Sequence, residues 1–131
     1  MAHRTILIID ETPDHRTILS HLLRAEGYHV FEATAGAEAL DQARNARPDL
    51  ILLALSLPDR PGWETTRRLR ALQALAHTPI LGTTVYNTLL SASRVRALGC
   101  VGYVDKPFDI DYLLYRISTL LPDAPRAALL A

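Results

Sequence analysis

The stretch Asp49-Leu50-Ile51-Leu52-Leu53-Ala54-Leu55, with Pro48 before it and Leu57-Pro58-Asp59 after it, decides the fold of this chain. From Leu50 onward it is an apolar run of strand length, and prolines bound it on both sides. Such a run is typical of a strand with helices on both faces, in the middle of a parallel sheet. In open parallel sheets, ligands bind at the carboxyl ends of the strands. The residue expected there is Ala54, whose methyl group can do no acid–base or nucleophilic work.

Length and composition indicate one ordinary globular domain of 131 residues, with 49% hydrophobic and 21% charged residues. The formal net charge is zero. A protein built to coat nucleic acid or an anionic membrane needs a basic excess, so we expect neither partner. No signal peptide or membrane-length apolar segment is recognisable, and we expect the chain in the cytoplasm. Cys100 is the only cysteine, which excludes an internal disulfide and a cysteine-based metal framework.

Four further strands are predicted from apolar, β-branched runs, at residues 5–9, 28–33, 78–84 and 101–104. Helical spacing of apolar residues predicts helices that start near Thr12 or Asp14 and end at Gly27, and at residues 37–43, 63–75, 87–98 and 109–121. Asp109 is the predicted N-cap of the last helix. Strands that alternate with helices over short connections predict a parallel sheet covered on both sides. We expect residues 1–121 to form this domain and residues 122–131 to be a C-terminal tail or linker remnant.

Polar side chains stand where three of these strands end. The first strand is followed by two acids, the fourth ends in two hydroxyls, and the fifth is followed by the only lysine; these residues are Asp10, Glu11, Thr83, Thr84 and Lys106. Carboxylate oxygens are ligands for Mg²⁺, and a lysine supplies a compact charge for a phosphoryl oxygen. The set is typical of a divalent-metal and phosphoryl site. A carboxylate is missing at the central position, Ala54.

An ordered set of short motifs extends over nearly the whole chain: Ile8-Ile9-Asp10-Glu11, Gly27-Tyr28, Gly36-Ala37-Glu38-Ala39-Leu40, Pro48-Asp49-Leu50-Ile51-Leu52-Leu53, Leu57-Pro58-Asp59 with Gly62, Pro79-Ile80, Thr84, and Gly99 to Lys106-Pro107-Phe108. In this order and spacing, the chain resembles the receiver domain of two-component response regulators, the CheY-like superfamily. The resemblance implies an α/β fold, a doubly wound, flavodoxin-like (βα)5 domain whose five-stranded parallel sheet has the strand order 2-1-3-4-5.

The resemblance also implies a role for each residue at the strand ends. It places the family's phosphoacceptor aspartate at Ala54. It matches the remaining positions to the metal-binding acids Asp10 and Glu11, to the hydroxyl that follows the phosphoryl group, Thr84, to the switch aromatic, Tyr103, and to the phosphoryl-contacting lysine, Lys106. Glu11 in place of the commoner aspartate is a mild departure from the family. Ala54 is the decisive one, because alanine cannot form an acyl phosphate and supplies no metal ligand.

The chain is therefore expected to be an atypical receiver-like domain with no catalysis of its own. It would act by phosphorylation-independent binding of a protein partner, which is a sensor kinase, another regulator or a second copy. No cofactor is assigned, and a Mg²⁺ site at Asp10 and Glu11 is expected to be weak or vestigial. In the competing interpretation Lys106 simply pairs with these acids. Two alternatives remain open: a relocated acceptor, at Ser56 or Asp59, and a flavodoxin-like domain that binds a small ligand in the emptied pocket.

A partner face is expected where the helix at 87–98, the strand at 101–104 and the helix at 109–121 lie together, as in other receivers. The candidate interface residues combine apolar, acidic and basic side chains: Leu89, Leu90, Arg94, Arg96, Asp105, Asp111, Tyr112 and Arg116. Mixed opposite charges suit a symmetric interface and hence a homodimer. An ordinary surface is the competing interpretation. In the third helix, Arg67, Arg68 and Arg70 are expected to form a solvated face.

Overall fold

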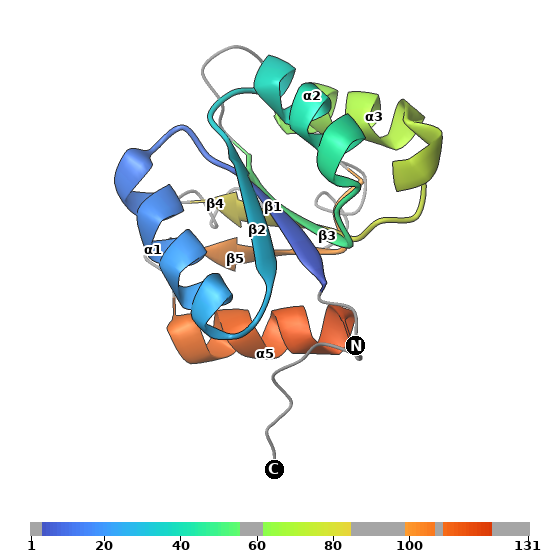
Figure 1. Ribbon diagram of the computed structural model, residues 1–131. Coiled ribbons are helices and arrows are strands. Elements are labelled where there is room, and N and C mark those ends of the chain that lie inside the picture. Colours follow the sequence, from blue (N-terminus) through green and yellow to red (C-terminus); the bar gives the residue numbers. More distant parts are fainter. Residues whose placement is uncertain (1–3, 56–61, 85–98, 107–108, 122–131) are drawn as a thin grey trace.

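The computed structural model describes residues 4–55, 62–84, 99–106 and 109–121 (Figure 1). The strands in these ranges are β1 (Thr5–Ile9), β2 (His29–Ala33), β3 (Leu50–Ala54), β4 (Ile80–Thr84) and β5 (Gly102–Asp105). The helices are α1 (Pro13–Ala25), α2 (Gly36–Ala46), α3 (Gly62–Ala71) and α5 (Ile110–Leu120), with a short 3-10 helix, η1 (Gln73–Leu75). The helix predicted at 87–98 and the tail at 122–131 lie outside the described residues.

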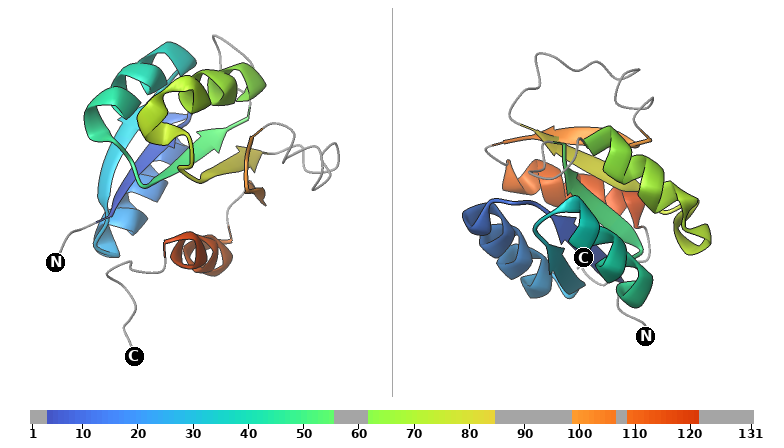
Figure 2. Two further views of the ribbon diagram at one scale, coloured as in Figure 1. Left: turned by 90° about the vertical axis from the view of Figure 1, so that its right-hand side faces the viewer. Right: turned by 90° about the horizontal axis from the view of Figure 1, so that it is seen from above.

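The strands form one parallel sheet in the order β2-β1-β3-β4-β5, which confirms the predicted fold class. Helices α1 and α5 pack on one face, and α2 and α3 pack on the other (Figures 1 and 2). The strand β3 lies in the middle, where it pairs with β1 and β4. Its register sets Ala54 beside Thr83 at the carboxyl end of the sheet.

From Leu50 to Leu53, the side chains of β3 alternate between two separate cores. Leu50 and Leu52 pack in the core under α1 and α5. Ile51, Leu53 and Ala54 pack in the core under α2 and α3. All five residues of the strand are buried, so each of them must be apolar for the strand to lie between two helical layers.

Two helix ends follow the sequence signals. The carboxylate of Asp109 accepts a hydrogen bond from the backbone N–H of Tyr112 at 3.1 Å, which confirms the predicted N-cap of α5. Gly27, just beyond the end of α1, has a φ of 96°, a conformation that side-chain-bearing residues rarely adopt. Pro13 opens α1, and Thr12 is its N-cap residue without a side-chain cap bond.

The third predicted helix, 63–75, is not continuous. It divides into α3 and η1 at Leu72, whose ψ of 120° is extended. The side chain of Arg70 bridges the backbone on both sides of this break. Its Nη1 donates hydrogen bonds to the carbonyl oxygens of Leu75, at 2.9 Å, and of Thr78. Its Nη2 donates to the carbonyl oxygen of Gly99 at 3.0 Å. Arg67 and Arg68 are exposed as expected, but the prediction of a solvated Arg70 was wrong. Its guanidinium group donates hydrogen bonds to the carbonyl oxygens of three residues, two before β4 and one before β5.

Candidate functional site at the strand ends

The parallel register brings the sequence-predicted polar residues to one edge of the sheet. Ala54 pairs with Thr83, and the backbone N–H of Lys106 donates to the carbonyl oxygen of Thr84 at 2.9 Å. On the other side, the backbone N–H of Asp10 donates to the carbonyl oxygen of Ala33 at 3.0 Å. The carboxyl ends of β1, β3, β4 and β5 therefore lie at the same edge of the sheet.

Asp10 has hydrogen-bond or ion-pair partners at both carboxylate oxygens and at its carbonyl oxygen. It is 2% exposed, and its Oδ1 accepts a hydrogen bond from the backbone N–H of Thr12 at 2.9 Å. Its Oδ2 lies 2.7 Å from Nζ of Lys106 and 3.6 Å from Nδ1 of His15. Its carbonyl oxygen accepts from Nη1 of Arg16 at 2.8 Å. Both carboxylate oxygens thus already have donors from the protein.

The other candidate residues lie around this pair with different exposure. Ala54 and Thr84 are buried, whereas Glu11 is exposed. Tyr103 is partly buried and packs against the core that contains Ala54. The aromatic ring of Tyr103, the expected switch residue, is therefore in contact with the core on the α2 and α3 side of the sheet.

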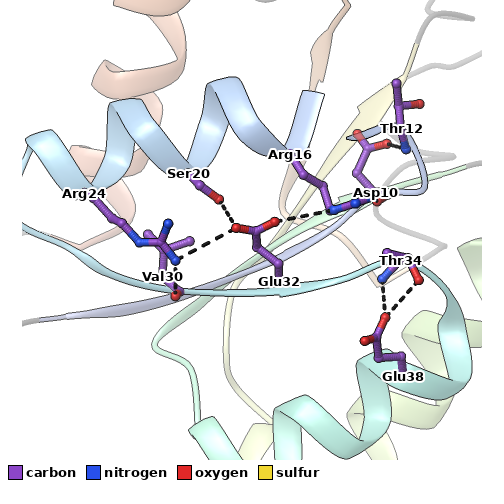
Figure 3. A network of polar contacts seen from close by, with 9 residues as sticks. All are labelled: Asp10, Thr12, Arg16, Ser20, Arg24, Val30, Glu32, Thr34 and Glu38. Atoms are coloured by element: carbon purple, nitrogen blue, oxygen red, sulfur yellow. Dashed lines mark hydrogen bonds and ion pairs between the residues drawn. The ribbon is translucent and has the colours of Figure 1, made fainter. Parts of the chain in front are cut away.

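A second polar network, which the sequence reasoning missed, holds α1 against β2 (Figure 3). The carboxylate of Glu32 accepts a hydrogen bond from the hydroxyl of Ser20 at 2.6 Å. It also lies 3.4 Å from Nε of Arg16 and 3.9 Å from Nη2 of Arg24. The same Nη2 of Arg24 donates to the carbonyl oxygen of Val30. The available signal was the spacing of Arg16, Ser20 and Arg24, which places them on one face of a helix. Arg16 connects this network to the backbone of Asp10.

In the first turn of α2, the carboxylate of Glu38 contacts Thr34, which lies just before the helix. Oε1 of Glu38 accepts from the backbone N–H of Thr34 at 2.6 Å and from its hydroxyl at 2.9 Å (Figure 3). These hydrogen bonds stabilise the charged form and hold the pKa of Glu38 below its ordinary value. The contact fixes the loop between β2 and α2.

Comparison with known proteins decides the family. Residues 6–118 match the family model of the response regulator receiver domain. The chain belongs to this receiver domain family. A similar relative is the polar-differentiation response regulator DivK of Brucella anthropi, 32% identical over 121 residues that cover 92% of this chain and 98% of that protein. The domain is thus a receiver of two-component signalling.

Solved receiver structures agree with this fold. The chemotaxis response regulator CheY4 of Vibrio cholerae has a TM-score of 0.83 and 30% identity, and the match covers 91% of this chain and 99% of that one. The receiver domain of the sensor histidine kinase PA1611 of Pseudomonas aeruginosa has a TM-score of 0.83 and 28% identity, covering 93% and 100%. That receiver carries a magnesium ion in its active site cleft.

The residues of the present receiver do not fit such an ion. The side chain of Ala54 offers no oxygen, Glu11 is exposed, and the carboxylate of Asp10 already accepts from Thr12 and Lys106. Among the residues that the structure describes, no group of three or more aspartate, glutamate, histidine or cysteine side chains is placed to hold a metal. Mg²⁺ prefers several oxygen ligands in octahedral geometry, which this donor set does not provide.

The remaining sequence-predicted residues are only partly described. Leu89, Leu90, Arg94 and Arg96 of the expected partner face lie outside the described residues, as do Ser56 and Asp59, the alternative acceptors. Asp105 is the last residue of β5. On α5, Asp111 and Tyr112 are exposed, whereas Arg116 is partly buried over Gly102. In the described ranges no helix combines the length and apolar character needed to cross a membrane.

Proposed function

We propose that this receiver works without being phosphorylated, as a non-catalytic binding module in two-component signalling. The observation that carries the proposal is Ala54, at the carboxyl end of the central strand. The resemblance places the family's phosphoacceptor at this position, and a buried methyl group cannot form an acyl phosphate. The protein would then act in the cytoplasm through contacts with another protein.

The loss of the acceptor removes the usual energy source of the receiver switch. A two-state equilibrium moves from 1:99 to 99:1 only with about 5.5 kcal/mol of differential interaction. Without a phosphoryl group at position 54, the state of Thr84 and Tyr103 must be set by the sequence or by a bound partner. The partly buried Tyr103, in contact with the core, supports a state fixed by packing.

The described part of α5 supports a protein partner. Tyr112 is 45% and Tyr115 62% exposed on this helix, and aromatic residues are enriched at interfaces. Arg116 has a buried Nε without a hydrogen-bond partner within the described ranges, and the exposed Asp111 lies five residues before it on the same helix. A sensor kinase, another regulator or a second copy would meet this helix, the last giving a homodimer with opposite charges facing each other.

The test is incubation with acetyl phosphate and Mg²⁺, followed by intact mass measurement. The native protein should show no phosphoryl adduct, and Ala54→Asp, measured alongside it, should gain one. A stoichiometric adduct on the native protein would disprove the proposal. Peptide mapping of that adduct to Ser56 or Asp59 would identify a relocated acceptor instead.

A further inference from the structure

We infer that Lys106 is the resident cation at the carboxyl ends of the strands and takes the place at Asp10 that a divalent metal ion takes in a magnesium-binding receiver. The domain would then keep its strand ends together without metal. The inference rests on the assignment of Ala54 made under the proposed function. It is tested without any phosphoryl donor, so that one proposal can fail while the other stands.

The ammonium group of Lys106 compensates the buried negative charge of Asp10. The carboxylate of Asp10 is almost entirely withdrawn from water, and a buried charge requires a partner and hydrogen bonds. Nζ of Lys106, on a side chain that is 10% exposed, lies 2.7 Å from Oδ2, the distance of a strong charge-assisted hydrogen bond. The backbone N–H of Thr12 satisfies Oδ1. The acid is therefore already neutralised by the protein.

The ammonium group is also positioned to oppose a metal ion. It contacts Oδ2, the oxygen of Asp10 that the backbone N–H of Thr12 does not bind, and a second cation at this carboxylate would be repelled at short range. A metal would have to displace Lys106 and leave it without this carboxylate. The substitution at Ala54 removes the second carboxylate that could receive the displaced lysine. Among the described residues, Lys106 is paired with one carboxylate, that of Asp10, whose Oδ2 also lies 3.6 Å from Nδ1 of His15.

The backbone of Lys106 is held at the carboxyl end of β4. Its backbone N–H donates to the carbonyl oxygen of Thr84, so the residue that carries the ammonium group is fixed to the end of β4. The side chain then reaches the end of β1. One residue in this way ties the exits of β1, β4 and β5, a task for which a metal-binding receiver can use its ion.

The experiment compares the native protein with Lys106→Met, which keeps the aliphatic stem and removes the charge. Melting temperature is recorded in EDTA and in about 10 mM MgCl₂, and Mn²⁺ affinity is measured by electron paramagnetic resonance. Since a ligand raises the melting temperature only when its concentration exceeds its Kd, the native value should change by less than about 1 °C. Lys106→Met should melt lower in EDTA, recover in part with Mg²⁺, and bind Mn²⁺ at least about tenfold more tightly because Asp10 is now uncompensated.

Arg68→Met serves as the matched control, because Arg68 pairs with Glu64 on the exposed face of α3. It should behave as the native protein in both measurements. A clear rise of the native melting temperature with Mg²⁺ would overturn the inference. An unchanged Mn²⁺ affinity in Lys106→Met would overturn it too, since Lys106 would then not be what excludes the ion.

A second variant keeps the test decisive if Lys106→Met does not fold. Asp10→Asn combined with Lys106→Met removes both charges and leaves no buried ion uncompensated. This double variant should fold and should not respond to Mg²⁺. If its melting temperature rises with Mg²⁺ as in a metal-binding receiver, the ion binds without Asp10, and the inference is wrong.

Discussion

Nζ of Lys106 lies 2.7 Å from Oδ2 of Asp10, and this contact joins the carboxyl end of β5 to that of β1 although the two strands are not neighbours in the sheet. Breaking a buried ion pair by removing one partner costs about 3–5 kcal/mol, because the other charge stays buried. Lys106→Met and Asp10→Asn should each lower the free energy of unfolding by about this amount. Urea denaturation of both single variants and the double variant gives the coupling energy; strictly additive effects would contradict a direct pair.

Arg70 should matter far more for stability than its neighbour Arg68. Arg70→Met removes the hydrogen bonds that Arg70 donates to the carbonyl oxygens of Leu75, Thr78 and Gly99. A hydrogen bond to a charged group contributes about 1.5–3 kcal/mol to stability. We expect a loss of about 2–4 kcal/mol in the free energy of unfolding. Arg68→Met, which breaks only an exposed pair with Glu64, should change it by at most about 0.5 kcal/mol. Equal effects in urea denaturation would show that the contacts of Arg70 are dispensable.

Two glycines at β5 should respond differently to alanine. At Gly99, φ is 92° and an added Cβ would lie 2.5 Å from Cγ2 of Thr66, a buried side chain, so Gly99→Ala should cost at least about 2 kcal/mol. At Gly102, the added Cβ would meet Nη2 of Arg116 at 2.5 Å, the far end of a flexible side chain. Gly102→Ala should therefore cost less than about 1 kcal/mol. A thermal melt of both variants checks the order, and a reversed order would refute the packing described around Thr66.

Cys100 should make stability depend on pH in the alkaline range. Burial raises the pKa of its thiol from 9.0 to about 11, against the opposing effects of Thr66 and Arg70. Because the folded state favours the neutral thiol, this contribution is fully present below pH 9 and is lost as the pH rises through 9 to about 11. The stability difference between the native protein and Cys100→Ala should fall by about 2–3 kcal/mol over that range. Urea denaturation at several pH values measures it; a constant difference would contradict the raised pKa.

A carboxylate introduced at position 54 should strengthen metal binding. Ala54→Asp adds a carboxylate at the carboxyl end of β3 and gives Lys106 a second anion to contact. Since affinity for a divalent ion rises with the number of carboxylate ligands, Mg²⁺ affinity should rise by roughly tenfold or more. Isothermal titration of native and variant protein with MgCl₂ provides the comparison. An unchanged affinity would mean that the geometry around Asp10 no longer suits an ion.

The fold could be predicted because it depends on features that are local in the sequence. The uninterrupted apolar run from Leu50 to Ala54 predicts a strand buried on both faces, and its alternation with helical segments predicts a parallel sheet. Strand ends then place Asp10, Thr84 and Lys106 at one edge without any knowledge of side-chain contacts. The resemblance to receivers supplied the strand order.

The side-chain partners could not be predicted in the same way. An arginine in a helix is normally solvated, and nothing around Arg70 in the sequence reveals that the chain turns at Leu72 and brings three carbonyl oxygens to it. The network of Glu32 depends equally on how α1 crosses β2. Whether Lys106 contacts Asp10 or a metal ligand set is likewise a matter of packed geometry.

The central strand has one further consequence, for the unfolded chain. Thr5 and Asp49, which stand 44 positions apart, exchange hydrogen bonds at the start of β1 and β3, and every pairing of β3 joins segments distant in sequence. Such non-local pairing is slow to form. Until both neighbours arrive, the uncharged run Leu50-Ile51-Leu52-Leu53-Ala54 remains exposed, and this makes it a segment through which newly synthesised chains are prone to aggregate.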